Sequence, residues 1–426
     1  MKTKFILILF LALFLSLHAF PKRNVFKRPL QDAEYYYLYE DYQEALYLYK
    51  DLDTSGYSNA NIKYRIGICY IHSDFEKEKA IPYLKEAAKN VSPEYDEADL
   101  FEKSSPYETY YYLGKVFLID NQLDSAARYF AKYRSTLPKD DLQNLIFVNN
   151  EILSCRIADD QKPRAQIKDI VNAGSAINSR FSEVNPVVTS NEDILIYTSK
   201  LQFYDAIFFS KKINDQWSSP VNITPQIGTD GRYYPCFLSF DGNTLLLVRE
   251  SIFESNIYMS SYSRETGKWS KAEEIKGAVN SSNYETHACL SKDGNTLYFT
   301  SNRPEGYGGM DIYVSHKSDD NDWGKPENLG TQINTPFNET APFICENNNK
   351  LYFSSQGHFT LGGYDYFYTE RNAHAEWTLP ENVGYPINTT DDNIFFYPVK
   401  NGKVGYYPTY KKDSEGKYDI YRVEFK

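Results

Sequence analysis

Cysteine and histidine are scarce in this 426-residue chain, and their spacing matches no common metal or redox motif. The five cysteines include no CxxC pair, which excludes zinc ribbons and thioredoxin-type redox sites. The six histidines form no HxH or HxxxH pair. Small secreted domains held by disulfides carry a dense and even set of cysteines, which is also missing here. We therefore predict no metal, no cofactor and no disulfide framework.

The chain also lacks a GxSxG turn, the motif that carries the nucleophilic serine of many hydrolases. A hydrolase that combines a propeller with a peptidase would need this turn, a downstream histidine and a further domain. The last sequence repeat runs to the final residues, so we expect no such domain. The sequence predicts that the protein is not an enzyme.

Basic residues are fewer than acidic residues. The chain has 46 Lys and Arg against 57 Asp and Glu, a formal net charge of −11. Such a surface repels a phosphate backbone, so nucleic acid is excluded as an expected partner.

Long hydrophobic runs are absent except at the start, where Lys2 and Lys4 precede an apolar run over residues 5–15. A positive start, a short apolar core and a small residue at Ala19 predict a signal peptide over residues 1–19 and an exported protein. An uncleaved anchor is the alternative, because Leu17 is large for a cleavage site. No cysteine occurs before Cys69, which argues against a lipid anchor, and no other segment is apolar enough to span a membrane.

A repeat fills the second half of the chain. An Asp or Asn followed by an aliphatic and aromatic pair returns five times, at separations of 51, 55, 54 and 54 residues, and a Trp follows the first four. The repeat positions are Asp205, Asn256, Asp311, Asp365 and Asp419, with Trp217, Trp269, Trp323 and Trp377. Short strand-like runs at a period near 50 predict the blades of a β-propeller.

The acidic repeat positions allow two interpretations. They could form a ring of metal ligands, or they could accept hydrogen bonds from turn amides. Asn256 favours structural acceptors, because a charge needed for a metal is poorly replaced by an amide. Cys236 and Cys289 occupy equivalent places in adjacent repeats, which predicts small buried side chains rather than a disulfide between them.

The ends of this half suggest how the ring closes. Residues 170–183 parallel residues 327–339 and form the tail of a repeat without its beginning, whereas the fifth repeat lacks such a tail. We predict a five-bladed propeller over residues 166–426, closed by a strand at 168–179 that completes the last blade. The first strand of that blade is expected within residues 392–396.

Residues 30–160 show helical spacing with paired small residues. These positions are Gly67, Ala80, Gly114 and Ala126, with Pro138 at the end of the last pair. They resemble the tetratricopeptide (TPR) repeat, an α-solenoid of antiparallel helix pairs. The wide spacing from Gly67 to Gly114 predicts an inserted turn and helix at residues 91–108, and residues 141–158 are expected to form a capping helix.

The propeller units resemble the PD40 (TolB-type, WD40-like) repeat, most strongly over Ser301-Asn302-Arg303-Pro304 and Gly308-Gly309-Met310-Asp311-Ile312-Tyr313. TPR repeats followed by a PD40 propeller resemble the front half of envelope proteins of Bacteroidetes type, including those associated with type IX secretion. The resemblance implies a periplasmic or outer-membrane-associated scaffold whose partners are envelope proteins and whose helical groove and propeller loops hold them. The alternative is a binding module for a glycan, a peptidoglycan fragment or a peptide on the propeller face.

Overall fold

The computed structural model describes residues 25–74, 76–160, 165–251, 254–318, 322–411 and 414–426. The predicted signal peptide lies outside these residues. The chain divides into two compact units, residues 1–149 and 150–426. The first unit is helical and the second is a five-bladed β-propeller, which confirms the predicted fold class. Within the described ranges, no helix combines the length and the apolar character needed to cross a membrane.

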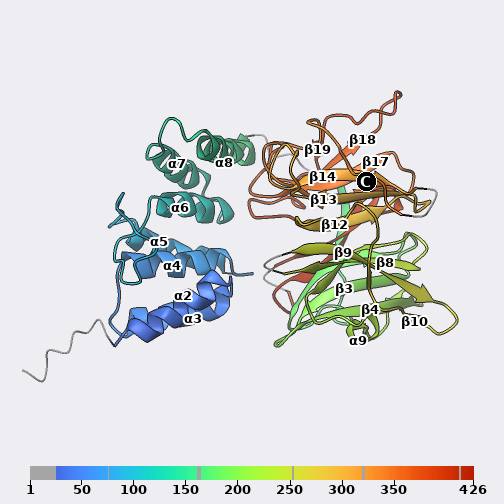
Figure 1. Cartoon of the computed structure of the whole chain (residues 1–426), viewed down its shortest axis with the longest axis horizontal. Coiled ribbons are helices and arrows are strands. Elements are labelled where there is room, and N and C mark those ends of the chain that lie inside the picture. Colours follow the sequence, from blue (N-terminus) through green and yellow to red (C-terminus); the bar gives the residue numbers. More distant parts are fainter. Residues whose placement is uncertain (1–24, 75, 161–164, 252–253, 319–321, 412–413) are drawn as a thin grey trace, which may run out of the picture. The chain divides into compact units, whose positions relative to one another are not determined.

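The helical unit is a stack of antiparallel helix pairs that follow one another in chain order (Figure 1). Side-chain caps begin two of these helices: Asp41 accepts a hydrogen bond from the amide of Glu44, and Asn59 accepts one from the amide of Ile62. The elements are α2 (Lys27–Leu38), α3 (Tyr42–Thr54), α4 (Ala60–Ile71), η1 (Lys77–Lys79), α5 (Ala80–Ala87), α6 (Glu108–Ile119), α7 (Leu123–Arg134) and α8 (Leu142–Asp160), which runs across the boundary between the units.

The helix predicted within residues 91–108 is wrong. The segment between α5 and α6 consists of turns, closed at its base by a bridge between Val91 and Ser105. The side chains of Asp96 and Asp99 accept hydrogen bonds from amides two residues later, so each forms a local turn that competes with a helix. We call residues 88–107 the insertion.

Each blade of the propeller is an antiparallel sheet whose first strand lies nearest the axis. Blade 1 contains β2 (Ser182–Val188), β3 (Ile194–Lys200), β4 (Asp205–Ile213), β5 (Gln216–Trp217) and β6 (Val221–Asn222); α9 (Thr224–Ile227) leads to blade 2, with β7 (Tyr233–Leu238), β8 (Thr244–Glu250), β9 (Ser255–Ser263), β10 (Lys268–Trp269) and β11 (Glu273–Glu274). Blade 3 contains β12 (Glu285–Leu290), β13 (Thr296–Ser301), β14 (Asp311–His316) and β15 (Glu327–Asn328), and blade 4 contains β16 (Glu339–Ile344), β17 (Lys350–Ser355), β18 (Asp365–Glu370) and β19 (Glu381–Asn382). Blade 5 contains β20 (Tyr397–Val399), β21 (Val404–Thr409) and β22 (Asp419–Phe425), with η2 (Lys400–Gly402) between its first two strands.

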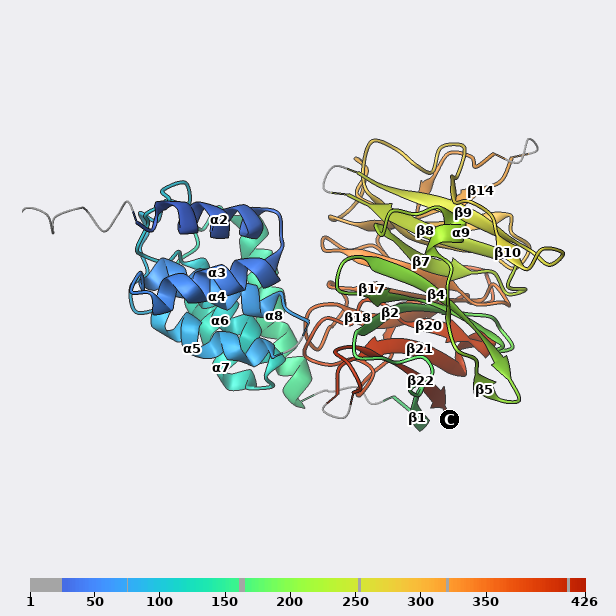
Figure 2. The same cartoon turned by 90° about the horizontal axis from the view of Figure 1, so that it is seen from below.

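Blade 5 is completed by β1 (Ile167–Asn172), which pairs antiparallel with β22, so the two ends of the propeller unit lie side by side (Figure 2). The strand is shorter than the predicted 168–179. It ends at Asn172 because that side chain accepts the amide of Gly174, whose φ is +87°. The predicted first strand of blade 5 is also displaced, since β20 begins at Tyr397.

The propeller has two differently built faces. On one, which we call the loop face, the loops from second to third strands meet the linkers that enter the next blade, for example residues 301–311 and 335–339. On the other, which we call the turn face, tight turns join first and second strands, for example residues 239–244 and 290–296. Any candidate site on this unit therefore belongs to one of these faces or to the axis.

Candidate functional site

Three of the five acidic repeat positions hold the loop that precedes their own strand. Asp311 accepts hydrogen bonds from the amides of Tyr307 and Gly308, at 2.5 and 3.1 Å. Asp365 accepts one from the amide of Leu361 at 2.8 Å, and Asp419 accepts one from the amide of Glu415 at 3.0 Å. All three carboxylates are buried. Their contacts are those of structural acceptors that fix loop amides.

The outer strand of the same blades supplies a further donor to each carboxylate. The side-chain amides of Asn328 and Asn382 donate to Asp311 and Asp365 at 2.8 and 2.7 Å. Asn172 donates to Asp419 at 2.8 Å, although it comes from β1, at the opposite end of the unit. The closing strand therefore reproduces in blade 5 the contact that a neighbouring strand makes in blades 3 and 4.

The other two repeat positions are built differently. Asn256 donates to Glu274 at 3.3 Å, and its side-chain oxygen has no partner among the described residues. Asp205 is only half-buried. The five positions do not converge on one site, and the part of the chain that the structure describes contains no group of three His, Cys, Asp or Glu side chains able to hold a metal ion.

The repeat tryptophans lie on the turn face, in the hairpins after the third strands, and three carry a cation over the ring. The nitrogen of Lys212 is 5.3 Å from the centre of Trp217, and that of Lys317 is 5.3 Å from Trp323. The guanidinium of Arg371 is 4.3 Å from Trp377. Trp269 instead contacts the ring of Tyr262. These pairs are cation–π contacts within a blade, worth about 0.5–1 kcal/mol each where exposed.

The glycines of the long loops allow one blade to touch the next on the loop face. A Cβ on Gly308 would lie 2.0 Å from the carbonyl oxygen of Phe337, and one on Gly362 would lie 2.4 Å from that of Thr390. Gly416 meets Phe181 in the same way at 2.0 Å, where blade 5 adjoins blade 1. The Gly-Gly motif therefore serves backbone contact between blades.

Beside these contacts, the loop face presents aromatic side chains to solvent. Each comes from the loop between the second and third strands of its blade. The exposed fractions are 88% for Phe203, 51% for Tyr307, 72% for Phe359 and 45% for Tyr410. Sequence analysis missed these residues, although the signal exists: an aromatic side chain recurs in the loop ahead of the repeat acid.

The axis of the propeller is closed by side chains from blades that are not neighbours. The hydroxyl of Tyr397 in blade 5 donates to the carbonyl of Leu238 in blade 2 at 2.8 Å and accepts from the amide of Leu238 at 3.0 Å. Phe343 of blade 4 lies 4.6 Å from the ring of Tyr397 and 5.9 Å from Phe237 of blade 2. These buried side chains form an aromatic plug that occupies the axis at this level.

The first strands of blades 2 and 3 hold Cys236 and Cys289, and the strand of blade 3 also carries an unusual histidine. All five cysteines of the chain are buried and none is in a disulfide, which agrees with the prediction for Cys236 and Cys289. His287 has a φ of +34° at a β-bulge, and its ring lies between those of Tyr234 and Phe395. Burial lowers the pKa of His287 to about 4, so the ring is neutral, and its described hydrogen-bond partner is the hydroxyl of Thr340 at 3.2 Å. It has no carboxylate or thiol partner there with which to act as a general base.

In the helical unit, the predicted small positions lie where helices pack closely. A Cβ on Gly67 would lie 2.5 Å from the side chain of Leu84, and one on Gly114 would lie 2.5 Å from Phe130. Ala80 and Ala126 are fully buried. The predicted Pro138 is exposed and follows α7, which ends at Arg134.

The insertion covers part of α4. Its Tyr95 donates to Asn61 at 3.2 Å, and its Glu97 pairs with Arg65 at 3.1 Å. Arg65 is 2% exposed, although it is an arginine, because it also pairs with Glu34 at 3.3 Å and stacks on Tyr37 at 4.3 Å. Burial by itself would lower the pKa of Arg65, but attraction to Glu34 and to the surrounding tyrosine hydroxyls together more than offsets it, so the pKa is raised and the guanidinium stays charged. This face of α4 is occupied by the chain's own insertion.

Three comparisons with known proteins were informative to different degrees. No protein-family model matches the chain, and no curated protein matches it. Among solved structures, the chain is similar to TolB from Acinetobacter baumannii, at 14% identity over 68% of this chain and 71% of that one, with a TM-score of 0.37. It is also similar to an alpha-L-arabinofuranosidase from Lactobacillus brevis, at 13% identity over 60% of this chain and 94% of that one, with a TM-score of 0.39. At these values neither likeness carries an argument about activity or ligand.

Proposed function

We propose that this protein is a non-enzymatic scaffold of the bacterial cell envelope, exported to the periplasm and associated with the outer membrane through a partner protein. The observation that carries the proposal is the series of exposed aromatic side chains on the loop face, namely Phe203, Tyr307, Phe359 and Tyr410. Large apolar side chains that are gathered on one face and left in water are typical of protein interaction sites, where aromatic residues supply much of the binding energy.

The chemistry of the described residues supports binding rather than catalysis. Three of the repeat carboxylates are engaged by loop amides, His287 is neutral and has no acidic partner among these residues, and the cysteines are buried thiols. A reaction site needs a nucleophile or metal, a base and a group that orients it, within mutual reach. We therefore propose partners that are proteins, with the helical unit as a second contact surface.

The helical unit offers a surface of the same kind at its first two helices. Tyr35 and Leu38 of α2, Tyr39 directly after it and Tyr47 of α3 are exposed large side chains. A stack of helix pairs presents such faces to peptides or helices of other proteins. The part of α4 that lies under the insertion is already occupied, so we propose that a partner segment engages the uncovered part of this unit.

The alternative is a module that binds a glycan, a peptidoglycan fragment or a peptide on the propeller face. The plug of Phe237, Phe343 and Tyr397 restricts such a ligand to one face, since the axis is filled. Exposed aromatic rings can also stack on sugars, so the same loop-face residues would bind the glycan in this alternative.

The test is in-cell cross-linking of the tagged full chain in its native host, with mass spectrometry of what is attached. The first variant carries Phe203→Ser, Tyr307→Ser and Phe359→Ser. The control is Leu379→Ser, which removes a side chain that is 76% exposed and lies in the segment before β19. We expect one or two stoichiometric envelope proteins with wild type and with the control, and their loss with the triple variant. Recovery of no protein partner with wild type would refute the scaffold and favour glycan screening.

A further inference from the structure

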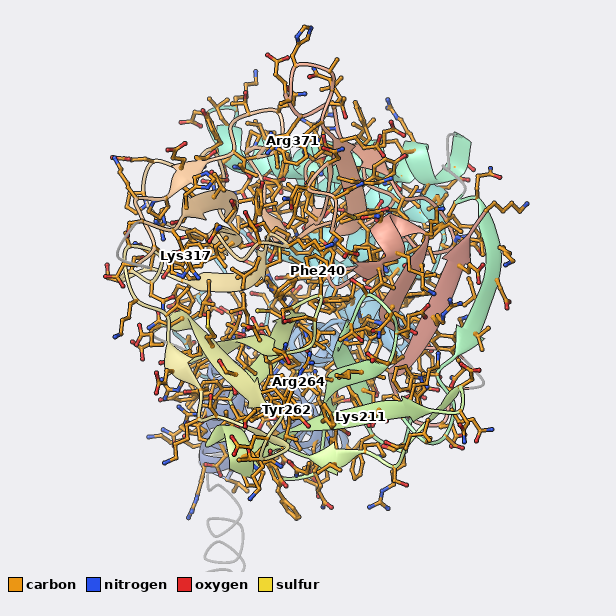
Figure 3. The ribbon with its side chains drawn as sticks, turned by 90° about the vertical axis from the view of Figure 1, so that its right-hand side faces the viewer. Lys211, Phe240, Tyr262, Arg264, Lys317 and Arg371 are labelled. Atoms are coloured by element: carbon orange, nitrogen blue, oxygen red, sulfur yellow. The ribbon has the colours of Figure 1, made fainter. Side chains whose placement is uncertain are left out.

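A cleft of about 360 Å³ opens on the turn face of the propeller, away from the loop-face aromatics. It lies between the tight turns of blades 2 and 3 and the corresponding turn of blade 4. Phe240 and Leu290 supply apolar surface, and Asp241, Asp293 and Glu346 supply carboxylates. Figure 3 shows Phe240 near the middle of this face, with Lys317, Arg371 and Arg264 around it.

Two of the carboxylates are fixed in place and have no counter-ion in the part of the chain that the structure describes. Asp241 accepts hydrogen bonds from the hydroxyl of Ser239 at 2.6 Å and the amide of Asn243 at 3.2 Å. Asp293 is held in the same way by Ser291 and Asn295, at 2.5 and 3.1 Å. Partial burial raises the pKa of Asp241, but the hydrogen bonds from its turn outweigh this effect, and hydrogen bonds from the equivalent turn likewise lower the pKa of Asp293, so both carboxyl groups are charged at neutral pH.

The cations near the cleft are engaged elsewhere. Lys292 pairs with Glu346 at 2.8 Å, which leaves the lining with the charge of Asp241 and Asp293 unbalanced. Arg264 donates its Nε to the side chain of Asn243 at 3.1 Å. Among the described ion pairs, none involves Asp241 or Asp293.

The aromatic rings of the turn face show how this protein surrounds such rings with cations. Trp217, Trp323 and Trp377 each carry a Lys or Arg of their own blade within about 5 Å. Phe240 contacts the rings of Phe237 and Phe343 in T-shaped geometry, at 5.8 and 6.2 Å. Among the described residues, no cation lies over its ring, and the carboxylates of Asp241 and Asp293, which have no ion-pair partner among those residues, line the same cleft.

We propose that this cleft receives an arginine side chain from a partner protein. The planar guanidinium would lie on the ring of Phe240, and the carboxylates of Asp241 and Asp293 would accept its N–H groups. Arginine fits better than lysine, because its flat and weakly hydrated cation both stacks on aromatic rings and forms paired bonds with carboxylates. The inference rests on the proposed scaffold function and names the chemistry of one partner contact.

The test uses the full chain and two capped pentapeptides, Gly-Gly-Arg-Gly-Gly and its counterpart with citrulline, the neutral analogue of arginine. Saturation-transfer NMR titrations report binding of each peptide. The first variant is Asp241→Asn with Asp293→Asn. The second, Phe240→Leu, keeps apolar volume but removes the ring. Asp215→Asn is the control, since it removes an exposed carboxylate from the hairpin between β4 and β5.

We expect the arginine peptide to bind wild type and Asp215→Asn alike, and the citrulline peptide to show no transfer. The double Asn variant should weaken binding about tenfold and Phe240→Leu about threefold, as expected for a charge pair and for a cation–π contact. Equal transfer to the citrulline peptide, unchanged affinity in the double variant, or no transfer from wild type at about 10 mM peptide would each overturn the proposal. If the double variant does not fold, Phe240→Leu decides.

These outcomes are separate from those of the scaffold test. Partners recovered by cross-linking, together with an arginine peptide that does not bind, would leave the scaffold standing and remove only the arginine site. The opposite pair of results is also informative. If the arginine peptide binds in the NMR titration but no protein is cross-linked in the native host, the scaffold is refuted and the arginine-binding cleft is retained.

Discussion

Glu192 of blade 1 and Arg422 of blade 5 form a doubly hydrogen-bonded ion pair across the seam where the ring closes, with N to O distances of 2.6 and 3.2 Å. Lys400 donates to the same carboxylate, as does the hydroxyl of Tyr406 at 2.7 Å. Glu192 is buried and has a φ of +58°. The seam is therefore held by a charged cluster in addition to the pairing of β1 with β22.

We expect Glu192→Gln to lower the free energy of unfolding of the propeller by about 2 kcal/mol. Removal of one partner of a buried ion pair costs about 3–5 kcal/mol, and the partial exposure of Arg422 and Lys400 reduces this. The measurement is urea unfolding at pH 7. The matched control is Glu424→Gln, which removes a partly exposed partner of Arg422 and should change little. Equal effects of the two variants would contradict a special role for the seam.

The buried carboxyl groups predict a stability maximum in mildly acidic solution. Burial raises the pKa of Glu339 and of Asp365 to about 7. Each therefore binds its proton more tightly in the folded state, so its effect is to decrease stability as pH rises from about 4 to 7. For Glu192, hydrogen bonds from Arg422, Lys400 and Tyr406 outweigh desolvation and lower the pKa to about 2, so its contribution is present above about pH 4 and is lost toward pH 2.

Thermal melting between pH 2 and pH 8 checks this expectation. The midpoint should be highest near pH 4 to 5 and should fall on both sides. In Glu192→Gln the fall on the acid side should be smaller, while the fall toward pH 7 remains. A midpoint that rises steadily from pH 4 to pH 8 would show that Glu339 and Asp365 are ionised at no cost in the folded protein.

Gly308→Ala should destabilise the propeller by about 2 kcal/mol or more, because the new Cβ would meet backbone oxygens of Phe337 and Thr335 at 2.0 and 2.4 Å. Gly294→Ala in the same blade is the matched control. That glycine has a φ of +70° but open space around it, so only the backbone strain of about 1 kcal/mol applies. Chemical unfolding of both variants measures the difference, and a smaller loss for Gly308→Ala would argue against the contact between blades.

Tyr397→Phe should cost about 1–3 kcal/mol, since it leaves the amide and carbonyl of Leu238 without the hydroxyl that bonds them across the axis. Tyr407→Phe is the control, because Tyr407 is also buried in blade 5 and no hydrogen bond of its hydroxyl is described. The melting temperatures of both variants measure the difference, and we expect the larger decrease for Tyr397→Phe. Similar values for both would mean that solvent or a rearranged neighbour satisfies Leu238.

The sequence by itself determined the two-part architecture, because the spacing of repeated residues can be read along the chain without knowing the tertiary contacts. The number of blades was predicted by the spacing of the repeat positions, Asp205, Asn256, Asp311, Asp365 and Asp419. The match between residues 170–183 and 327–339 predicted which blade β1 completes. Gly67 and Gly114 marked the close helix contacts, since only a missing Cβ allows the side chains of Leu84 and Phe130 to approach.

Only the tertiary structure decided which surfaces remain free and which distant residues meet. The turns of the insertion and the end of β1 have a local cause, because the side chains of Asp96, Asp99 and Asn172 each accept a hydrogen bond from an amide two residues later. The plug at the axis, the pairing of Glu192 with Arg422 and the cleft beside Phe240 join residues from blades far apart in sequence. Such contacts depend on how the ring closes, and no local pattern of residues encodes that geometry.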